Sequence, residues 1–86
     1  MKVRIPTPLR SYTANQATVD ADGLTLAQLL HDLDCRYPGI RFRVVDEQGR
    51  LRQHMNIFVS GERCRDLSTS VEGLDEVVIM QALSGG

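Results

Sequence analysis

A single stripe of leucines constrains the fold of this chain more than any other feature. Between Thr25 and Pro38, apolar residues recur at i, i+3, i+4, i+7 and i+11, a spacing typical of a helix with one buried face: Leu26, Leu29, Leu30, Leu33 and Tyr37. Thr25 and Gln28 have the spacing of a helix capping box, and Pro38-Gly39 predicts the end of the helix. Because one helix cannot bury its stripe alone, the rest of the chain must supply a partner surface.

Short segments of alternating polarity predict that this partner is a β-sheet. "MKVRIP" opens the chain as a half-buried strand that Pro6 and Pro8 interrupt, and a second strand is expected around residues 16–20. "MNIFV" and "DEVVIMQ" predict two more strands, with a turn at Gly61-Glu62 after the first of them. Residues 40–54 show no clear period, so we expect a loop there, with a short strand near Leu51.

The order strand, strand, helix, irregular segment, strand, strand predicts an α+β fold of the β-grasp, or ubiquitin-like, class. One main helix would pack on one face of a mixed sheet whose first and last strands lie side by side at the centre. The last strand then runs straight out to the chain end. We therefore expect a β-grasp domain over residues 1–81 and a flexible C-terminal tail over residues 82–86.

Composition excludes several classes of partner. The 86 residues carry a net charge of -1, which argues against nucleic acid and anionic membranes as main partners. The N-terminal segment has neither the apolar core of a signal peptide nor a membrane span, so we expect a cytoplasmic protein. In that compartment Cys35 and Cys64 are expected to be reduced thiols.

The tail residues Leu83, Ser84, Gly85 and Gly86 form the first candidate site. Two glycines can pass through a narrow channel and leave the terminal carbonyl unhindered, because they lack Cβ atoms. A carboxylate must be activated before a nucleophile can attack it. Adenylation of Gly86 with ATP, then displacement of AMP by sulfide or a persulfide, would leave a thiocarboxylate. The catalytic groups would belong to partner enzymes, so we expect no catalytic residue and no bound cofactor in this chain.

A second candidate site is an apolar patch on the sheet. Ile57, Val59, Val77 and Ile79 already supply one face, so Phe58, Val78 and Met80 are predicted to point to the other. If that face is uncovered, the patch leads to the tail and is suited to docking partners.

Other chemistry is weakly supported. His31 and Cys35 lie one helical turn apart, but two ligands fall short of a zinc site, and sequence places neither His54 nor Cys64 beside them, so no metal is expected. Two cysteines are too few for an iron–sulfur ferredoxin. Six arginines crowd one region and form either a solvated charged face or a patch that steers an acidic partner: Arg41, Arg43, Arg50, Arg52, Arg63 and Arg65.

Four stretches resemble the MoaD/ThiS family of sulfur carriers: "IPTPLRSYT", "LTLAQLLHDLDCRYPGI", "MNIFVSGE" and "DEVVIMQALSGG". Within that family the chain is most similar to the CysO branch, which serves cysteine biosynthesis. The resemblance implies a β-grasp fold, adenylation by an E1-like enzyme of the MoeB/ThiF type and thiocarboxylation of Gly86. It also implies transfer to a PLP-dependent cysteine synthase, with a metalloprotease releasing the product. Gly73-Leu74-Asp75 and Gln81 depart from the family pattern before and at the start of the tail.

Three alternatives to a carrier for cysteine biosynthesis stay open. A carrier of this kind could instead deliver sulfur to molybdopterin, to the thiazole of thiamine or to a secondary metabolite. A ubiquitin-like modifier would start from the same acyl-adenylate but transfer it to a lysine of another protein. Lys2 is the only lysine, so chains of this protein could form only there or at the α-amino group. A binding module with an inert tail is the third hypothesis.

Overall fold

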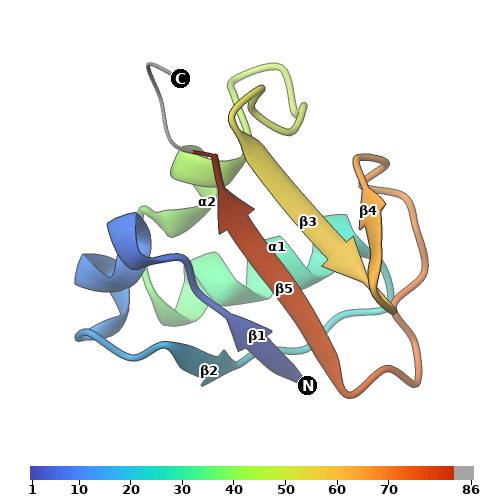
Figure 1. Cartoon of the computed structure of the whole chain (residues 1–86), viewed down its shortest axis with the longest axis horizontal. Helices are drawn as coiled ribbons and strands as arrows, with labels where there is room; N and C mark the ends of the chain where they lie inside the picture. Colours follow the sequence, from blue (N-terminus) through green and yellow to red (C-terminus); the bar gives the residue numbers. More distant parts are fainter. Residues whose placement is uncertain (83–86) are drawn as a thin grey trace.

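Five strands form one mixed sheet in the computed structural model, which describes residues 1–82 (Figure 1). Their order across the sheet is β2-β1-β5-β3-β4, and their bounds are Lys2–Arg4 (β1), Thr18–Asp20 (β2), Met55–Val59 (β3), Glu62–Cys64 (β4) and Glu76–Gln81 (β5). β1 and β5 are parallel neighbours, and the other pairs are antiparallel. The predicted central pairing of the first and last strands is confirmed, and so is the β-grasp fold.

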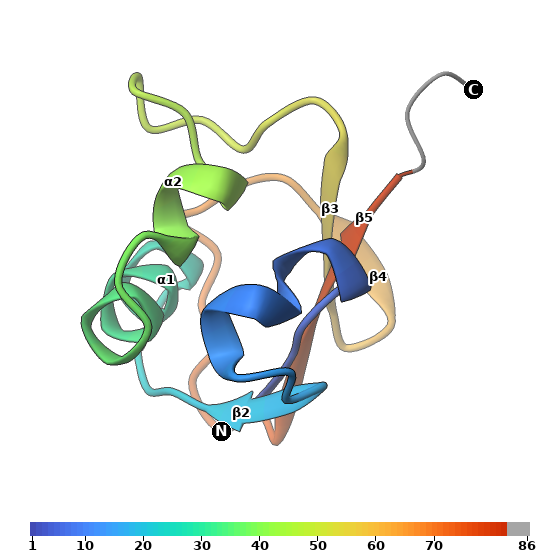
Figure 2. The same ribbon diagram turned by 90° about the vertical axis from the view of Figure 1, so that its left-hand side faces the viewer.

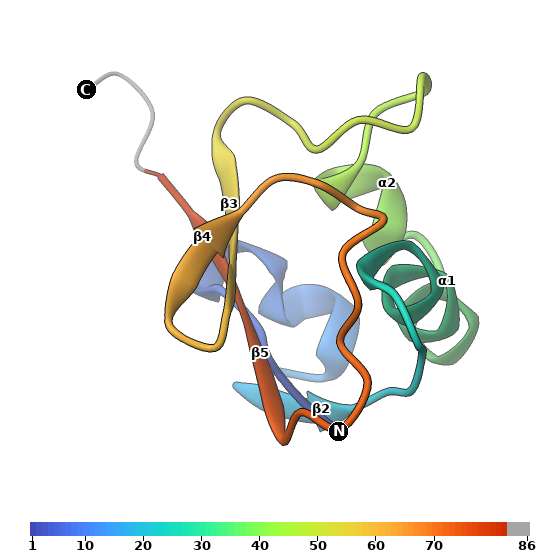
Figure 3. The same ribbon diagram turned by 90° about the vertical axis from the view of Figure 1, so that its right-hand side faces the viewer.

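Helices cover one face of this sheet. Figures 2 and 3 show α1 (Leu26–Arg36) and α2 (Ile40–Val44) on the same side of the strands. The predicted leucine stripe of α1 is buried, and the strand residues that complete the core are also the ones the alternation predicted: Val3, Met55, Ile57, Val77 and Ile79. Burying such apolar side chains contributes most of the favourable free energy of a domain this small.

The start of α1 follows the predicted capping box. Thr25 Oγ1 accepts the Gln28 N–H at 3.2 Å, and Gln28 Oε1 accepts the Leu24 N–H at 2.9 Å. The first two N–H groups of the helix donate to backbone carbonyls of segment 67–69, at 3.0 and 2.9 Å. The N-terminal donors of α1, which its own backbone cannot satisfy, therefore all have partners.

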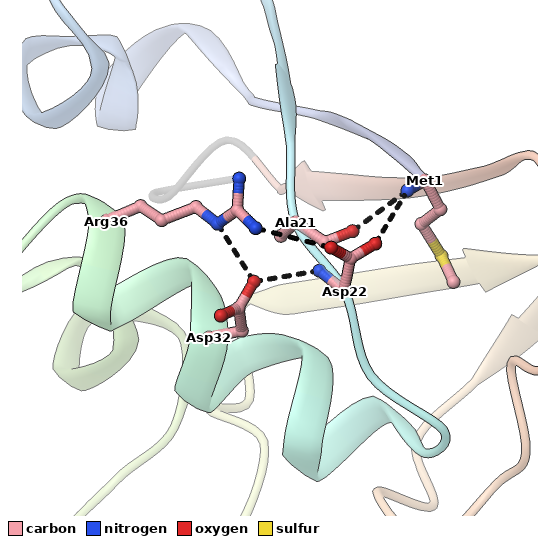
Figure 4. Close-up of polar contacts among 5 residues, drawn as sticks. All are labelled: Met1, Ala21, Asp22, Asp32 and Arg36. Atoms are coloured by element: carbon pink, nitrogen blue, oxygen red, sulfur yellow. Dashed lines mark hydrogen bonds and ion pairs between the residues drawn. The ribbon is translucent and has the colours of Figure 1, made fainter.

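A polar network ties the N-terminus to α1 (Figure 4). The Met1 ammonium group donates to the Ala21 carbonyl at 3.0 Å and lies 3.3 Å from Asp22 Oδ1. Arg36 pairs with Asp22 at 3.3 Å and with Asp32 at 2.9 Å, and Asp32 also accepts the Asp22 N–H at 2.8 Å. Three segments that are distant in sequence are thus joined at one corner of the molecule.

The expectation of a loop over residues 40–54 was wrong for its first five residues, which form α2. Gly39 starts this helix with φ +97°, and Asp34 Oδ1 accepts the N–H groups of Gly39 and Arg41 at 3.0 and 3.1 Å. Five residues are too few to show a helical period. Near Leu51, where a short strand was expected, a single bridge joins Leu51 to Val45.

Two other elements were not anticipated. A 3-10 helix, η1 (Thr7–Thr13), begins directly after Pro6 and contains Pro8, and β4 follows the turn after β3. The turn residues Ser60 and Gly61 both have positive φ, 53° and 80°, as a type I′ hairpin turn requires. β4 has only three residues, which are too few to display an alternating pattern.

The network at Met1 predicts a pH-dependent contribution to stability. The pKa of Asp32 is lowered, chiefly because its carboxylate accepts the Asp22 N–H and also because it pairs with Arg36. A group whose pKa is lower in the folded state stabilises the protein above its unfolded pKa of about 4, and loses this effect as the pH falls through the folded pKa. Asp32→Asn should therefore lower the melting temperature at pH 7 and have a shrinking effect below about pH 4.

Thermal unfolding followed by circular dichroism from pH 7 to pH 2 measures this difference. Asp75→Asn is the matched control, since no hydrogen bond or ion pair of its side chain occurs within residues 1–82. If Asp32→Asn lowered the melting temperature equally at pH 7 and at pH 2, ionised Asp32 would not be the stabilising group.

Candidate functional site

The candidate tail starts where β5 leaves the sheet. β5 ends at Gln81, and the Ala82 N–H donates to the His54 carbonyl at 2.8 Å, so backbone pairing continues to the last described residue. This end of β5 lies at the same end of the molecule as α2 (Figure 1). The tail residues themselves lie outside the described part of the chain: Leu83, Ser84, Gly85 and Gly86.

Phe58, Val78 and Met80 lie together on the sheet face opposite the helices, and we call them the outer-face patch. Phe58 is directly opposite Val78 across the β3–β5 pair, and Met80 is opposite Asn56. Met80 is 49% exposed, while Phe58 and Val78 are half-buried. The alternation of β3 and β5 therefore assigned the faces as the structure has them, whereas the docking role of the patch stays a prediction.

Cationic side chains flank this patch on both sides. Arg4 of β1 is in register with Val78, and Arg63 of β4 is in register with Phe58. Next to the patch, a groove of about 620 Å³ runs between the end of β5 and the segment from Arg4 to Arg10, and Val78 and Met80 form part of its lining. Arg4 is paired with Glu76 at 3.7 Å, whereas Arg63 has no ion pair within residues 1–82. An apolar strip with charged residues at its edges and an adjoining hollow is suited to contact with another protein.

The structure divides the six crowded arginines among different roles. Arg65 donates to three backbone carbonyls, those of Met55, Leu51 and Arg52, at 2.7, 3.1 and 3.0 Å. It therefore clamps the loop that leads into β3. Arg63 lies beside the outer-face patch. The six arginines therefore form neither one solvated face nor one patch, because Arg63 lies beside the outer-face patch and Arg65 binds the loop that leads into β3.

A residue that sequence reasoning missed lies beside the root of the tail. Phe42 of α2 is 53% exposed, although Ile40 and Val44 of the same helix are fully buried. The Arg52 guanidinium carbon lies 4.7 Å from the centre of the Phe42 ring, a cation–π contact. The sequence does place an aromatic residue between two arginines in "IRFRV". While this segment was interpreted as a loop, that pattern did not predict a surface site.

The thiols do not form a metal centre within residues 1–82. His31 and Cys35 are exposed on α1, and Cys64 lies elsewhere, with its thiol 3.0 Å from Thr69 Oγ1. No group of three or more His, Cys, Asp or Glu residues in this part of the chain is placed to hold a metal ion. Both cysteines are free thiols. None of the described helices has the length and apolar character needed to cross a membrane.

Comparison with known proteins gives consistent matches over nearly the whole chain. The model of the ThiS family matches residues 3–86. The sulfur carrier protein CysO of Mycobacterium tuberculosis is 39% identical over 89 residues, which cover 98% of this chain and 96% of that protein. The structure is similar to the BexX/CysO complex of Amycolatopsis orientalis, with a TM-score of 0.90, 34% identity, and coverage of 99% of this chain and 98% of the matched one.

A second kind of solved structure is also similar. SAMP1 of Haloferax volcanii, a small archaeal modifier protein, superposes with a TM-score of 0.78 and 27% identity, covering all of this chain and 98% of its own.

The clamp formed by Arg65 predicts a specific loss of stability. Arg65→Ala should destabilise the protein by about 1 to 2 kcal/mol, because three backbone carbonyls lose a charged donor. Arg63→Ala is the matched control, an arginine two residues away in β4. No hydrogen bond or ion pair of its side chain occurs within residues 1–82, so it should change stability by less than about 0.5 kcal/mol. Urea unfolding measures both values, and equal losses would contradict the clamp.

Proposed function

Because this chain belongs to the ThiS family, we propose that it is a sulfur carrier whose C-terminal Gly86 bears the sulfur. The observation that carries the proposal is the likeness to mycobacterial CysO, a sulfur carrier protein, over 98% of the chain. The course of β5 supports it, since this central strand leads directly into the four residues that end in Gly85-Gly86.

The chemistry takes place on the terminal carboxyl group. Its oxygen attacks the α-phosphate of ATP, pyrophosphate leaves, and Gly86 becomes an acyl-adenylate. Sulfide then attacks the acyl carbon, and AMP leaves with the bonding electron pair. The product is a thiocarboxylate, in which one oxygen of Gly86 has been replaced by sulfur. This chain is the substrate in both steps, and an E1-like enzyme of the MoeB/ThiF type supplies the catalytic groups.

The tail has the dimensions that this reaction needs. Beyond Ala82 four residues remain, which span roughly 14 Å when extended at about 3.4 Å each. The carboxylate can therefore enter a site buried in another protein while the folded domain stays outside. The final two glycines have no side chains that would obstruct a narrow channel or shield the acyl carbon.

The outer-face patch is the docking surface for the activating enzyme in this proposal. It lies on β5, which leads to the tail, and on the neighbouring β3, so an enzyme that holds Gly86 in its site can cover Phe58, Val78 and Met80 at the same time. Burial of Met80, which is half exposed, would contribute to binding through the hydrophobic effect. The complex of CysO with BexX in Amycolatopsis supports a role in docking to partner proteins.

We propose that the sulfur is used in cysteine biosynthesis. The name of the mycobacterial relative and the "IPTPLR", "YPGI" and "HMNIFV" stretches favour a PLP-dependent cysteine synthase as the accepting enzyme, with a metalloprotease to release the product. Molybdopterin, thiamine or a secondary metabolite is the alternative destination. These recipients share the thiocarboxylate and differ only in the enzyme that consumes it.

A protein modifier is the second candidate, favoured by the likeness to SAMP1. Such a modifier would form an amide bond between Gly86 and a lysine of another protein. Chains of this protein could form only at Lys2 or at the α-amino group, which donates to the Ala21 carbonyl and pairs with Asp22. The two candidates diverge only after adenylation, so the chemical form of Gly86 distinguishes them.

Deletion of Gly86 tests the activation step. With the purified activating enzyme and ATP, the intact chain should give exchange of pyrophosphate into ATP, and the chain without Gly86 should give none, since the acyl group would then be misplaced by one residue. Leu24→Ser is the control, because this exposed side chain lies at the other end of the molecule. Undiminished exchange after the deletion would refute Gly86 as the activated residue.

Met80→Ser tests the docking patch in the same assay. The KM for the carrier should rise about tenfold while kcat is retained, as expected for a half-exposed apolar side chain in a binding surface. The matched control is again Leu24→Ser, in which a side chain that is 57% exposed is made polar. If both variants changed the KM equally, the outer face would have no special role in docking.

A further inference from the structure

A groove of about 410 Å³ lies at the root of the tail, on the α2 side of β5. Phe42, Arg43, Arg52, His54 and Gln81 contribute to its lining, and we call this set the tail-root site. The residues come from α2, from the loop that leads into β3 and from the end of β5. The site is distinct from the outer-face patch, with which it shares no residue.

The two arginines of this site are held in place by neutral groups. Arg43 Nε donates to the Tyr12 hydroxyl at 2.9 Å, and Arg52 Nε donates to the Phe42 carbonyl at 2.8 Å. Within residues 1–82 neither guanidinium forms an ion pair, whereas Arg36 pairs with two carboxylates. Asp46 is near enough to Arg52 for that charge to help lower the pKa of its carboxyl, but it does not form an ion pair with Arg52. Each guanidinium is thus oriented through one N–H and has further N–H donors for an anion, for which bidentate carboxylate pairing is the preferred geometry.

The exposed ring of Phe42 makes this site more than a solvated charge cluster. Its neighbours in α2, Ile40 and Val44, are completely buried, yet Phe42 is 53% exposed and stacked under Arg52. Aromatic side chains and arginines are the residues enriched in protein interfaces and in their energetic centres. The combination favours a protein ligand over a small inorganic ion.

The position of the site identifies which anion it can reach. The backbone of His54, one of its residues, holds Ala82, so the site borders the point where the tail begins. An adenylate on Gly86 would lie roughly 14 Å beyond Ala82 in an extended tail, too far for either arginine. Carboxylates on the protein that surrounds the tail can reach it. The whole chain has a net charge of -1, so this local positive charge is not a general property of its surface.

We propose that the tail-root site docks on carboxylates at the mouth of the channel in the activating enzyme that receives the tail. This inference rests on the proposed function and adds a second contact surface to it. Together with the outer-face patch, the tail-root site would hold the chain on both sides of the emerging tail. It acts on affinity and on the rate of encounter, and takes no part in the chemistry of Gly86.

The double variant Arg43→Gln/Arg52→Gln tests the proposal in the adenylation assay. The KM for the carrier should rise at least tenfold at about 50 mM salt with kcat unchanged, and the rise of KM with salt should become shallower than for the native chain. Lys2→Gln/Arg50→Gln is the matched control: it removes the same charge from exposed side chains that make no hydrogen bond or ion pair within residues 1–82. Equal effects of the two double variants, or a loss confined to kcat, would overturn the proposal.

A second measurement tests whether the tail-root site binds carboxylates, and it does not need the enzyme. A hexaglutamate peptide, titrated into the ¹⁵N-labelled protein at low salt, should shift the amide signals of residues 42, 43, 52, 54 and 82 more than those near Lys2 and Arg50. The shifts should vanish in Arg43→Gln/Arg52→Gln. Shifts spread evenly over all cationic residues would contradict a built site. If the enzyme did not adenylate the native chain, the proposed function would fail, and this titration would still decide whether the tail-root site binds carboxylates.

Discussion

The packing of one leucine stripe against one face of the sheet is the contact on which the rest of the structure depends. It requires a helix on that face only, and α1 and α2 both lie there. No helix of residues 1–82 covers the opposite face, on which Phe58, Val78 and Met80 lie. β5, the strand that leads to the tail, lies in the centre of the sheet between β1 and β3.

A strand that is fixed in the sheet and continues into a short tail is suited to being bound by another protein. β1 pairs with the first half of β5, from Glu76 to Val78, and β3 pairs with it from Val77 to Gln81. The His54 carbonyl extends the pairing to Ala82. The arginine clamp at Arg65 holds the loop that contains His54, because it binds backbone carbonyls on either side of that residue. The point at which the tail emerges is thereby positioned by tertiary contacts, with the outer-face patch on one side and the tail-root site on the other.

Sequence predicted the parts of this arrangement that depend on a repeating pattern. The helix from Leu26, its cap at Thr25 and the inward and outward faces of β3 and β5 all follow from periods of 3.6 and 2 residues. α2, β4 and η1 are too short to show a period, so they were missed or assigned to loops. The partners of the arginines could not be predicted either, because Arg65 binds carbonyls that only the folded chain brings near it. Phe42 was overlooked because its segment, which forms α2, was interpreted as a loop.

The chemical form of Gly86 in the cell tests the central claim most directly. The protein would be purified from its own cells, its thiol and thiocarboxylate groups alkylated, and the mass of its C-terminal peptide measured after digestion. A sulfur carrier predicts an alkylated thioester at Gly86, in which sulfur has replaced one oxygen. A lysine side chain of another protein joined to Gly86 would identify a modifier instead. An unaltered carboxylate, even after incubation with ATP, sulfide and the activating enzyme, would contradict the account.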